Sequence, residues 1–225
     1  MTQPIGRADR ILDAAGELLI KLGYRKVTIE DVARRAEIGK GTVYLHWPTK
    51  EQLFESLVLR ESLGLFAELT AALRAEPEII RPHRYYPLVF LATRRSPLLH
   101  AVVTGDTELL GNLKRSAHHE ETAGASETYY RLLLDRGLLR DDVPQLQAAL
   151  NATLTGFFIT DQINPAYAEL DDATKADALS HTIRRAFEPD VAPDHASLVD
   201  AAARTTELYD ELTARFRTWI YRPPR

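Results

Sequence analysis

The sequence predicts an all-α protein built from a small N-terminal domain and a larger C-terminal one. Apolar residues recur every three or four positions over several long segments, which is the spacing of one helix face. Two threonines, Thr28 and Thr49, are each followed three residues later by a side chain that can complete a capping box at a helix start. These signals predict three helices within residues 1–50 and a longer series of helices within 51–225.

Composition limits the class of protein. The chain has 225 residues, of which 45% are hydrophobic, so it can bury a sizeable core. It has no cysteine, which excludes a disulfide scaffold and a thiolate zinc site and fits a reducing cytosol. No apolar run approaches the roughly 18 residues that a membrane span needs. We therefore expect a soluble, cytoplasmic protein without a membrane partner.

The charge is distributed unevenly along the chain. The net charge is −4, but residues 1–50 carry +3 and residues 51–225 carry −7. A basic end on an acidic body is typical of a protein whose one end meets a polyanion. The basic excess is small, so this asymmetry favours such a partner only weakly.

The first two helices form the base of the N-terminal domain. The first is predicted over residues 7–22, where it has an apolar stripe. The second begins at Thr28, with Asp31 completing its capping box, and we expect glycine at Gly39 to break it where a turn is needed. Its narrow stripe of small apolar residues lets another helix pack closely; the stripe is Val32, Ala33 and Ala36.

The third helix, over residues 40–46, is predicted to bury one side only. Val43 and Trp47 are four residues apart and can both point inward. Its other sides are polar, aromatic and basic, with Lys40, Thr42, Tyr44 and His46. Pro48 ends this helix, and Lys50 lies in the first turn of the next one, where a lysine opposes the helix dipole. An external anion is a better reason for Lys50 than local stability.

Several segments of this region form a pattern that is specific as a set. They are Ile11 to Ala15, Gly23-Tyr24, Val27 to Ile29, Val32-Ala33 and, above all, the run GKGTVYLHWPTKEQL from Gly39 to Leu53. Residues 7–54 thereby resemble the DNA-binding domain of the TetR family of bacterial transcriptional regulators. The resemblance covers about the first quarter of the chain, and beyond it only the layout of a long helical domain is similar.

The resemblance implies a helix-turn-helix domain at 1–50 that binds double-stranded DNA. The helix at 40–46 would enter the major groove, with Thr42 and Leu45 near base edges. Tyr44, His46 and Lys50 would contact phosphates, and Thr28 could hold a phosphate at a helix start. The expected DNA-binding residues are Thr28, Lys40, Gly41, Thr42, Tyr44, Leu45, His46 and Lys50. Tyr44 and Trp47 could instead be core aromatics, and for Trp47 we favour the core.

The larger domain is predicted as helices separated by prolines and glycines. A helix from Thr49 toward Leu73 has no internal proline, and its length suits it to transmit movement into the DNA-binding domain. Further helices are predicted at 83–95, 97–104, 106–112, 114–136, 144–163, 172–187 and 195–220. The last of these has no assigned place.

Two of these helices suggest a dimer. Those at 144–163 and 172–187 are amphipathic and have more apolar surface than a monomer would leave open. The resemblance implies that they pair with their symmetry mates in a four-helix interface. One short helix reads only a few base pairs, so a homodimer would read a palindromic operator with half-sites about one helical turn apart.

The resemblance also implies a small-molecule effector that binds the 51–225 domain and releases the operator. Possible pocket residues are Phe66, Tyr85, Tyr86, His100, Tyr129, Tyr130, Phe158 and Asp161. Such a pocket would suit a moderately apolar or cationic ligand, although aromatic residues at helical spacing are often core. We expect no cofactor and no metal, because His118 and Glu121, which share a helix face, are better explained as solvated surface.

Two other classes of function stay open beside a ligand-responsive repressor. An all-helical enzyme or small-molecule carrier is one, although the sequence has no recognisable nucleophile elbow, phosphate loop or paired catalytic set. A protein-interaction adaptor without operator binding is the other, and the intact Lys40, Thr42, Tyr44 and Lys50 argue against it. The salt dependence of binding separates a DNA-binding regulator from an adaptor. DNA binding through several phosphates must weaken steeply as salt is added, whereas an adaptor contact need not.

Overall fold

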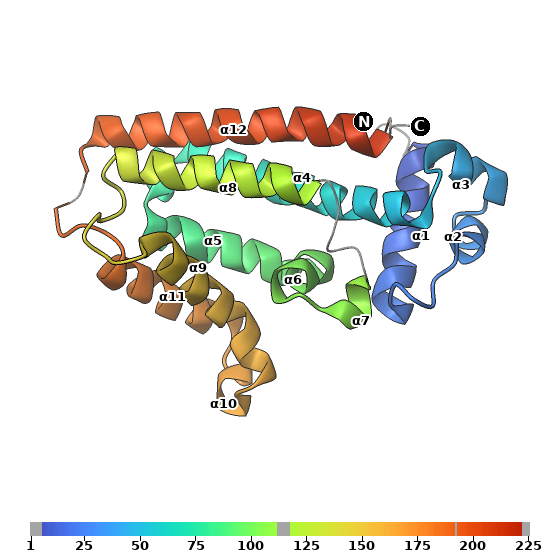
Figure 1. The fold of residues 1–225 in the computed structure, drawn as a ribbon, viewed down its shortest axis with the longest axis horizontal. Coiled ribbons are helices and arrows are strands. Elements are labelled where there is room, and N and C mark those ends of the chain that lie inside the picture. The colour runs from blue at the N-terminus through green and yellow to red at the C-terminus, as the bar shows by residue number, and fades with distance from the viewer. Residues whose placement is uncertain (1–5, 112–117, 192, 222–225) are drawn as a thin grey trace. The chain divides into compact units, whose positions relative to one another are not determined.

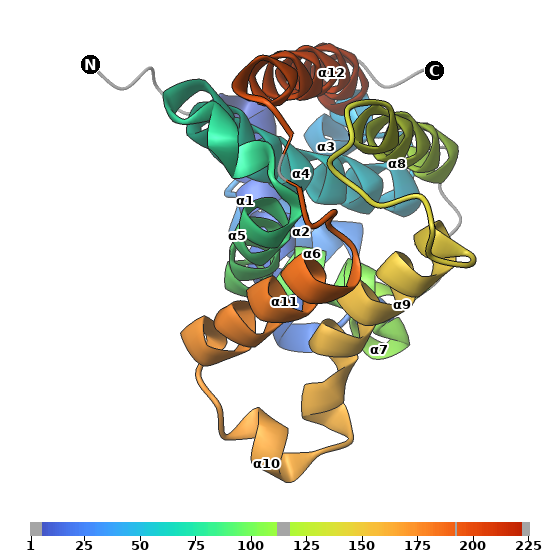
Figure 2. The ribbon, with the colours of Figure 1, turned by 90° about the vertical axis from the view of Figure 1, so that its left-hand side faces the viewer.

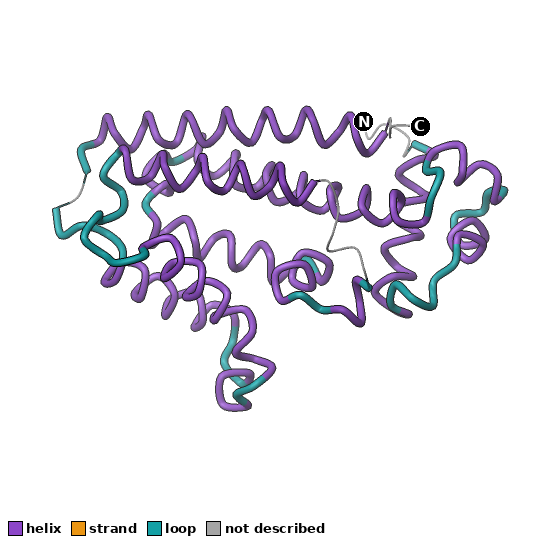
Figure 3. Tube along the Cα trace, viewed as in Figure 1, coloured by secondary structure: helices purple, strands orange, loops and turns teal. Residues whose placement is uncertain are grey.

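The computed structural model describes residues 6–111, 118–191 and 193–221, with the backbone alone over 118–123 (Figure 1). Within these ranges the regular elements are all helices, which confirms the predicted all-α class (Figure 3). The described residues form two compact units, one within 1–64, 97–116 and 212–225 and the other within 65–96 and 117–211. No helix in the described ranges is both long and apolar enough to cross a membrane.

The first unit contains the predicted three-helix domain. Its elements are α1 (Arg7–Leu22), α2 (Ile29–Arg35), α3 (Lys40–His46), the start of α4 (Lys50–Ala75), α6 (Pro97–Thr104), α7 (Thr107–Leu110) and the end of α12 (His195–Tyr221). The bounds of α1 and α3 agree with the prediction. The residues with no exposed surface in the three-helix core are Ile11, Leu12, Ala15, Leu19, Val27, Val32, Val43, Trp47, Leu53 and Phe54.

Both predicted capping boxes are present. The Asp31 backbone N–H donates to Thr28 Oγ1 at 3.1 Å, and the Thr28 N–H donates to Asp31 Oδ2 at 3.2 Å. At α4 the Gln52 N–H donates to Thr49 Oγ1 at 3.1 Å, and the Thr49 N–H donates to Gln52 Oε1 at 3.2 Å. Each box satisfies two N–H groups that a helix start leaves without intrahelical partners, so the starts of α2 and α4 are set locally.

The turn between α2 and α3 differs from the prediction. The residue in the left-handed region is Glu37, with φ 55°, whereas Gly39 has φ −71° and caps the start of α3. The Glu37 N–H donates to Arg34 O and the Ile38 N–H to Ala33 O, a Schellman arrangement that satisfies the last carbonyls of α2. The expectation that Gly39 supplies the break is wrong, because these two hydrogen bonds hold a non-glycine residue at the strained position.

The second unit surrounds a separate apolar core. Its elements are the rest of α4 and α12, η1 (Pro77–Ile80), α5 (Pro82–Arg95), α8 (His118–Asp135), α9 (Leu146–Ile159), η3 (Thr160–Gln162), α10 (Pro165–Ala168) and α11 (Asp172–Ala186). The sequence did not predict η1 or α10, and α9 changes to the tighter η3 before the predicted end. Gly137, with φ 64°, follows α8 as predicted; residues 114–117 lie outside the described ranges.

Helix α12, which had no assigned place, lies beside α4 and α8 in this unit (Figures 1 and 2). Arg74 of α4 pairs with Asp210 at 2.7 Å, and Arg136, just after α8, pairs with Asp200 at 2.7 Å. Helices α5 and α11 also lie side by side, as both views show.

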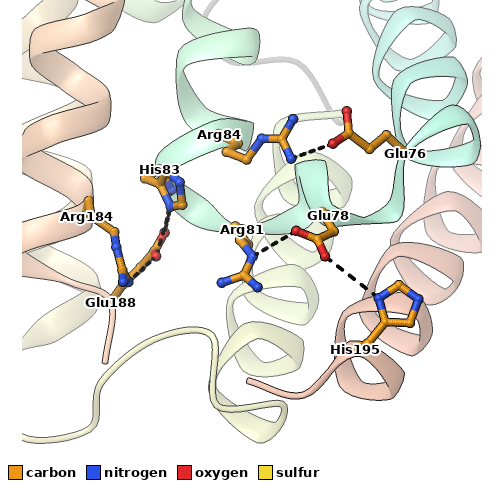
Figure 4. Close-up of polar contacts among 8 residues, drawn as sticks. All are labelled: Glu76, Glu78, Arg81, His83, Arg84, Arg184, Glu188 and His195. Carbon is orange, nitrogen blue, oxygen red and sulfur yellow. Dashed lines mark hydrogen bonds and ion pairs between the residues drawn. The ribbon is translucent and has the colours of Figure 1, made fainter. Parts of the chain in front are cut away.

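A polar network holds the start of α5 to the ends of two other helices (Figure 4). The buried Glu188 carboxylate, after α11, accepts from the His83 backbone N–H at 2.6 Å and from Arg184 at 2.9 Å. It also lies 2.8 Å from His83 Nδ1. Arg84 pairs with Glu76 at 2.7 Å, and Glu78 lies between Arg81 and His195. The Glu188 contacts fix the start of α5 against the end of α11.

Candidate DNA interface and effector site

Helix α3 is anchored on one side and exposed on the other. Val43 and Trp47 have no exposed surface, and Trp47 Nε1 donates to the buried Ser56 hydroxyl at 2.9 Å. Trp47 is therefore a core residue, as the sequence indicated. Leu45 is 86% exposed and Tyr44 is 44% exposed, although both are large side chains that proteins usually bury. The helix thus offers an apolar side chain and an aromatic hydroxyl outward.

The other predicted contacts of α3 differ in exposure. Lys40 and Gly41 are exposed, whereas Thr42 and His46 are partly buried. Lys40 Nζ lies 3.5 Å from Glu30 Oε2, and both side chains are more than half exposed. An exposed ion pair of this kind contributes little, so Lys40 can exchange Glu30 for another anion at small cost.

Thr28 is already committed within α2. Its hydroxyl donates to Asp31 Oδ2 at 2.6 Å while accepting from the Asp31 N–H. The hydrogen bond from Thr28 holds the pKa of the Asp31 carboxyl below its ordinary value. A phosphate bound at Thr28 would lie close to the negative carboxylates of Asp31 and Glu30 in the first turn of α2. The predicted phosphate contact of Thr28 would therefore need these side chains to rearrange.

Lys50 has an internal partner that sequence reasoning missed. Its Nζ donates to the backbone carbonyl of Tyr24 at 2.5 Å and lies 4.2 Å from the centre of the Tyr24 ring. Burial lowers the pKa of Lys50. The expectation that Lys50 has only a weak local reason for its position is therefore wrong, because its contacts with Tyr24 offset the unfavourable place at the helix start. Its contact with DNA stays a prediction.

Tyr24 joins Lys50 to α7 within the first unit. Its N–H donates to Leu109 O at 3.0 Å, and its hydroxyl donates to Glu51 at 3.0 Å. The backbone at Gly23 approaches α7 so closely that a Cβ there would lie only 2.9 Å from Glu108 O. Gly23 also has φ 75°, a conformation that glycine adopts readily. The Gly23-Tyr24 pair was visible in the sequence, but its partners are distant along the chain.

The structure brings four of the predicted effector residues together with a fifth. The ring centroids of Tyr85 and Tyr129 lie 5.1 Å apart, and Tyr86 lies 5.8 Å from Tyr85. The Tyr85 hydroxyl is hydrogen bonded to that of Tyr209, on which Phe66 stacks with 4.8 Å between ring centroids. We call Tyr85, Tyr86, Tyr129 and Tyr209 the tyrosine cluster; sequence reasoning had not included Tyr209. The cluster joins α5, α8 and α12, and the stacked Phe66 adds α4.

Burial controls the protonation of this cluster. It raises the pKa of each of its four tyrosines, that of Tyr209 to about 12. The ordinary pKa of tyrosine, about 10, already keeps the hydroxyls protonated near pH 7, and burial extends this neutral, hydrogen-bond-donating state to higher pH.

The remaining predicted effector residues lie in other surroundings. Phe158 packs against Phe90 at 5.0 Å, Tyr130 is partly buried next to Glu127, and His100 lies on α6 in the first unit. Asp161 is held by two cations, Arg94 at 2.8 Å and the almost completely buried Lys175 at 2.9 Å. Asp161 is thus neutralised within the fold.

The described side chains include no group of three or more residues suited to hold a metal ion. The side chains of His118 and Glu121, on which the metal hypothesis depended, lie outside the described residues.

A short helix fixed by two buried side chains after a sharp turn, with most of its remaining surface exposed, has the geometry of a helix-turn-helix motif, a class of DNA-binding element. Residues 11–57 match the model of the family "Bacterial regulatory proteins, tetR family". This match identifies residues 11–57 as a TetR-family DNA-binding domain, and the curated relatives described next support a TetR-family transcriptional regulator.

The curated relatives divide into long and short matches. The nucleoid occlusion factor SlmA of Marinobacter nauticus is 28% identical over 167 residues, which cover 72% of this chain and 84% of that protein. The transcriptional regulator QacR of Staphylococcus aureus is 46% identical over 55 residues, which cover 24% of this chain and 29% of QacR. Similarity to QacR is thus high but restricted to a short segment.

Two solved structures share the fold over most of the chain. A putative tetR family transcription regulator from Shewanella sp. PV-4 has a TM-score of 0.56 at 18% identity and covers 81% of this chain and 98% of its own. A gamma-butyrolactone receptor described as ArpA-like has a TM-score of 0.51 at 18% identity and covers 93% and 97%. At these identities the likeness concerns the fold alone.

Proposed function

We propose that this protein is a ligand-responsive repressor that binds a palindromic DNA operator as a homodimer and is released by a small molecule. The observation that carries the proposal is the surface of α3, where Leu45 is 86% exposed although Val43 and Trp47 are completely buried. Leaving a leucine in water on a well-anchored helix has no stability benefit. A DNA groove is the partner that the family assignment supplies for it.

Each exposed or partly buried residue of α3 has a proposed part in binding. Thr42 and Leu45 contact base edges, where a leucine suits the methyl group of thymine. Lys40, Tyr44 and His46 contact phosphates, which set the position of the helix. Gly41 is exposed and a Cβ there would meet nothing within 4 Å, so a DNA strand has room to approach its backbone.

Two further phosphate contacts lie outside α3 and need a change in the free protein. Lys50 exchanges its hydrogen bond to the Tyr24 carbonyl for one to a phosphate oxygen. The Thr28 hydroxyl exchanges its hydrogen bond to the Asp31 carboxylate in the same way. Both contacts therefore cost an existing hydrogen bond. Lys50 is the stronger candidate because it brings a positive charge.

The homodimer uses α9 and α11 in this proposal. On α9 the residues Ala148, Asn151, Ala152 and Thr155 are exposed, and on α11 the residues Asp177, Ala178 and His181 are exposed. The alanines among these positions, Ala148, Ala152 and Ala178, allow a second copy to approach closely. Two α3 helices would then read two half-sites about one helical turn apart.

The functional division that we propose is a DNA-binding domain at 1–50 and an effector and dimerisation domain at 51–225. Helix α4 begins at Lys50 and carries Phe66, which stacks on Tyr209 of the tyrosine cluster. A ligand that displaces Phe66 therefore acts on the same helix that carries Lys50. Release of DNA follows if that displacement alters the start of α4.

The proposal is tested by the salt dependence of DNA binding, measured by fluorescence anisotropy with a labelled duplex. Two lysines per protomer, Lys40 and Lys50, give four neutralised phosphates in a dimer and a slope of log K against log salt of about −3.6. Sedimentation velocity on the same samples gives the oligomeric state. A slope near zero would favour the adaptor or the carrier, and a monomer on the duplex would contradict the palindromic operator.

A further inference from the structure

The hydroxyl of Tyr129 is buried without a hydrogen-bond partner. Among the described side chains two buried polar atoms have no hydrogen bond, Tyr129 Oη and Asp161 Oδ1, and the second has Lys175 Nζ at 2.9 Å. The Tyr129 side chain is only 8% exposed, so water at the surface does not satisfy it. A buried unpaired hydroxyl lowers stability, and one that persists marks a functional site or a site for a missing partner.

Two aromatic rings from another helix lie next to the Tyr129 ring. Tyr85 and Tyr86, both on α5, lie with ring centroids 5.1 Å and 6.4 Å from that of Tyr129, which is on α8. Tyr85 is 2% exposed, whereas Tyr86 is only partly buried. Movement of the less confined Tyr86 ring is thus the simplest way to admit a ligand next to Tyr129.

The chemistry of the cluster is that of a neutral hydrogen-bond donor. Tyr85 and Tyr209 share one hydrogen bond, so one of these two hydroxyls keeps an unused proton, and Tyr129 keeps its own. Besides burial, the groups that perturb the pKa values of the four cluster residues are other tyrosines. Asp161, the acid among the predicted pocket residues, is already paired with Arg94 and Lys175.

We propose that the tyrosine cluster binds an uncharged, mainly apolar molecule with a hydrogen-bond-accepting oxygen, such as a ketone or an ester, and that Tyr129 donates to that oxygen. This inference rests on the proposed function, because it specifies the effector site of the regulator. An ion of either sign would lose its hydration without gaining a counter-charge in the cluster, so the site discriminates against charged analogues.

Four matched probes test the ligand class: acetophenone, ethylbenzene, benzoate and benzylamine, titrated into the full-length protein with ¹³C-labelled tyrosine. They have similar shape and differ in acceptor oxygen and charge. We expect acetophenone to bind in the millimolar range, as its nine heavy atoms allow, and to shift the ring signals of Tyr85, Tyr86 and Tyr129. Ethylbenzene should bind about tenfold more weakly, and the two ions should not shift these signals.

Two variants separate binding from stability. Tyr129→Phe removes a hydroxyl without a partner, so it should weaken acetophenone about tenfold, leave ethylbenzene unchanged and not lower the melting temperature. The matched control is Tyr167→Phe, which removes a hydroxyl that donates to Phe157 O at 3.1 Å. It should lower the melting temperature and leave acetophenone binding unchanged.

Several outcomes overturn the inference. They are the absence of acetophenone binding at the tyrosine cluster, a preference for benzoate or benzylamine, or equal affinity of Tyr129→Phe and the wild type for acetophenone. Anisotropy with duplex DNA on the same protein distinguishes this failure from failure of the proposed function. DNA binding with a steep salt dependence would leave the regulator standing while the ligand class falls.

Discussion

Replacing Lys50 by alanine separates a role in folding from a role in DNA binding. The variant loses the hydrogen bond from Nζ to the Tyr24 carbonyl at 2.5 Å and the contact with the Tyr24 ring at 4.2 Å. A charge-assisted hydrogen bond and a partly exposed cation–π contact together stabilise by about 1 to 3 kcal/mol. We expect the free energy of unfolding to fall by that amount.

The same variant should lose phosphate contacts. With four lysine contacts per dimer, affinity for DNA falls roughly 150-fold between about 50 and 200 mM salt. Without Lys50 two contacts remain, and the loss over the same range is roughly 12-fold. Because phosphates carry no sequence information, binding to every duplex should weaken alike.

The measurements are urea unfolding of the free protein and anisotropy titrations at several salt concentrations. Lys40→Ala is the matched control, since Lys40 has only the exposed Glu30 as a partner at 3.5 Å. It should reduce the salt slope equally and leave stability within about 0.5 kcal/mol of the wild type. If Lys50→Ala lowers stability but leaves the slope unchanged, Lys50 is a structural residue and not a phosphate contact.

Three further predictions concern the N-terminal domain. Thr42→Ala should alter base preference by about 1 to 3 kcal/mol at one position per half-site, and an identical selected sequence would remove Thr42 from the base contacts. Glu37→Gly should raise the free energy of unfolding by about 0.5 to 1 kcal/mol, because φ is 55° there; a lower urea midpoint would contradict it. The hydrogen bond from Thr28 lowers the pKa of Asp31 in the folded protein. The ionised Asp31 carboxylate therefore stabilises the fold at pH values above its unfolded pKa, near 4, and this stabilisation is lost as the pH falls through the lower folded pKa. Asp31→Asn should remove this part of the acid dependence, and thermal melts from pH 2 to about 6 that coincide with the wild type would disprove it.

Local patterns in the sequence predicted the parts of the fold that short-range contacts determine. Thr28 with Asp31 and Thr49 with Gln52 form the expected capping boxes, because both partners lie in one helical turn. The burial of Val43 and Trp47 follows from a spacing of four residues in the same way. Spacing thus predicted which side of α3 is buried, although Thr42 and His46, expected on its outer surface, are partly buried.

Contacts between distant residues could not be predicted in this way. The partner of Lys50 is a backbone carbonyl 26 residues earlier, which leaves no trace in side-chain spacing. Glu37 takes a left-handed conformation that propensity assigns to glycine, because the hydrogen bonds of the turn outweigh its preference. Tyr209 joins Tyr85 across 124 residues, so only the assembled helices reveal the tyrosine cluster.

The central claim is that α3 reads DNA as one half of a symmetric pair. Its most direct test is selection of the purified protein against random duplex DNA at low and moderate salt, with sequencing of the bound fraction. Our account predicts an enriched inverted repeat with half-sites about one helical turn apart and a preference that changes in Thr42→Ala and Leu45→Ala. Bound DNA without an enriched repeat, or a repeat that both variants select unchanged, would contradict it.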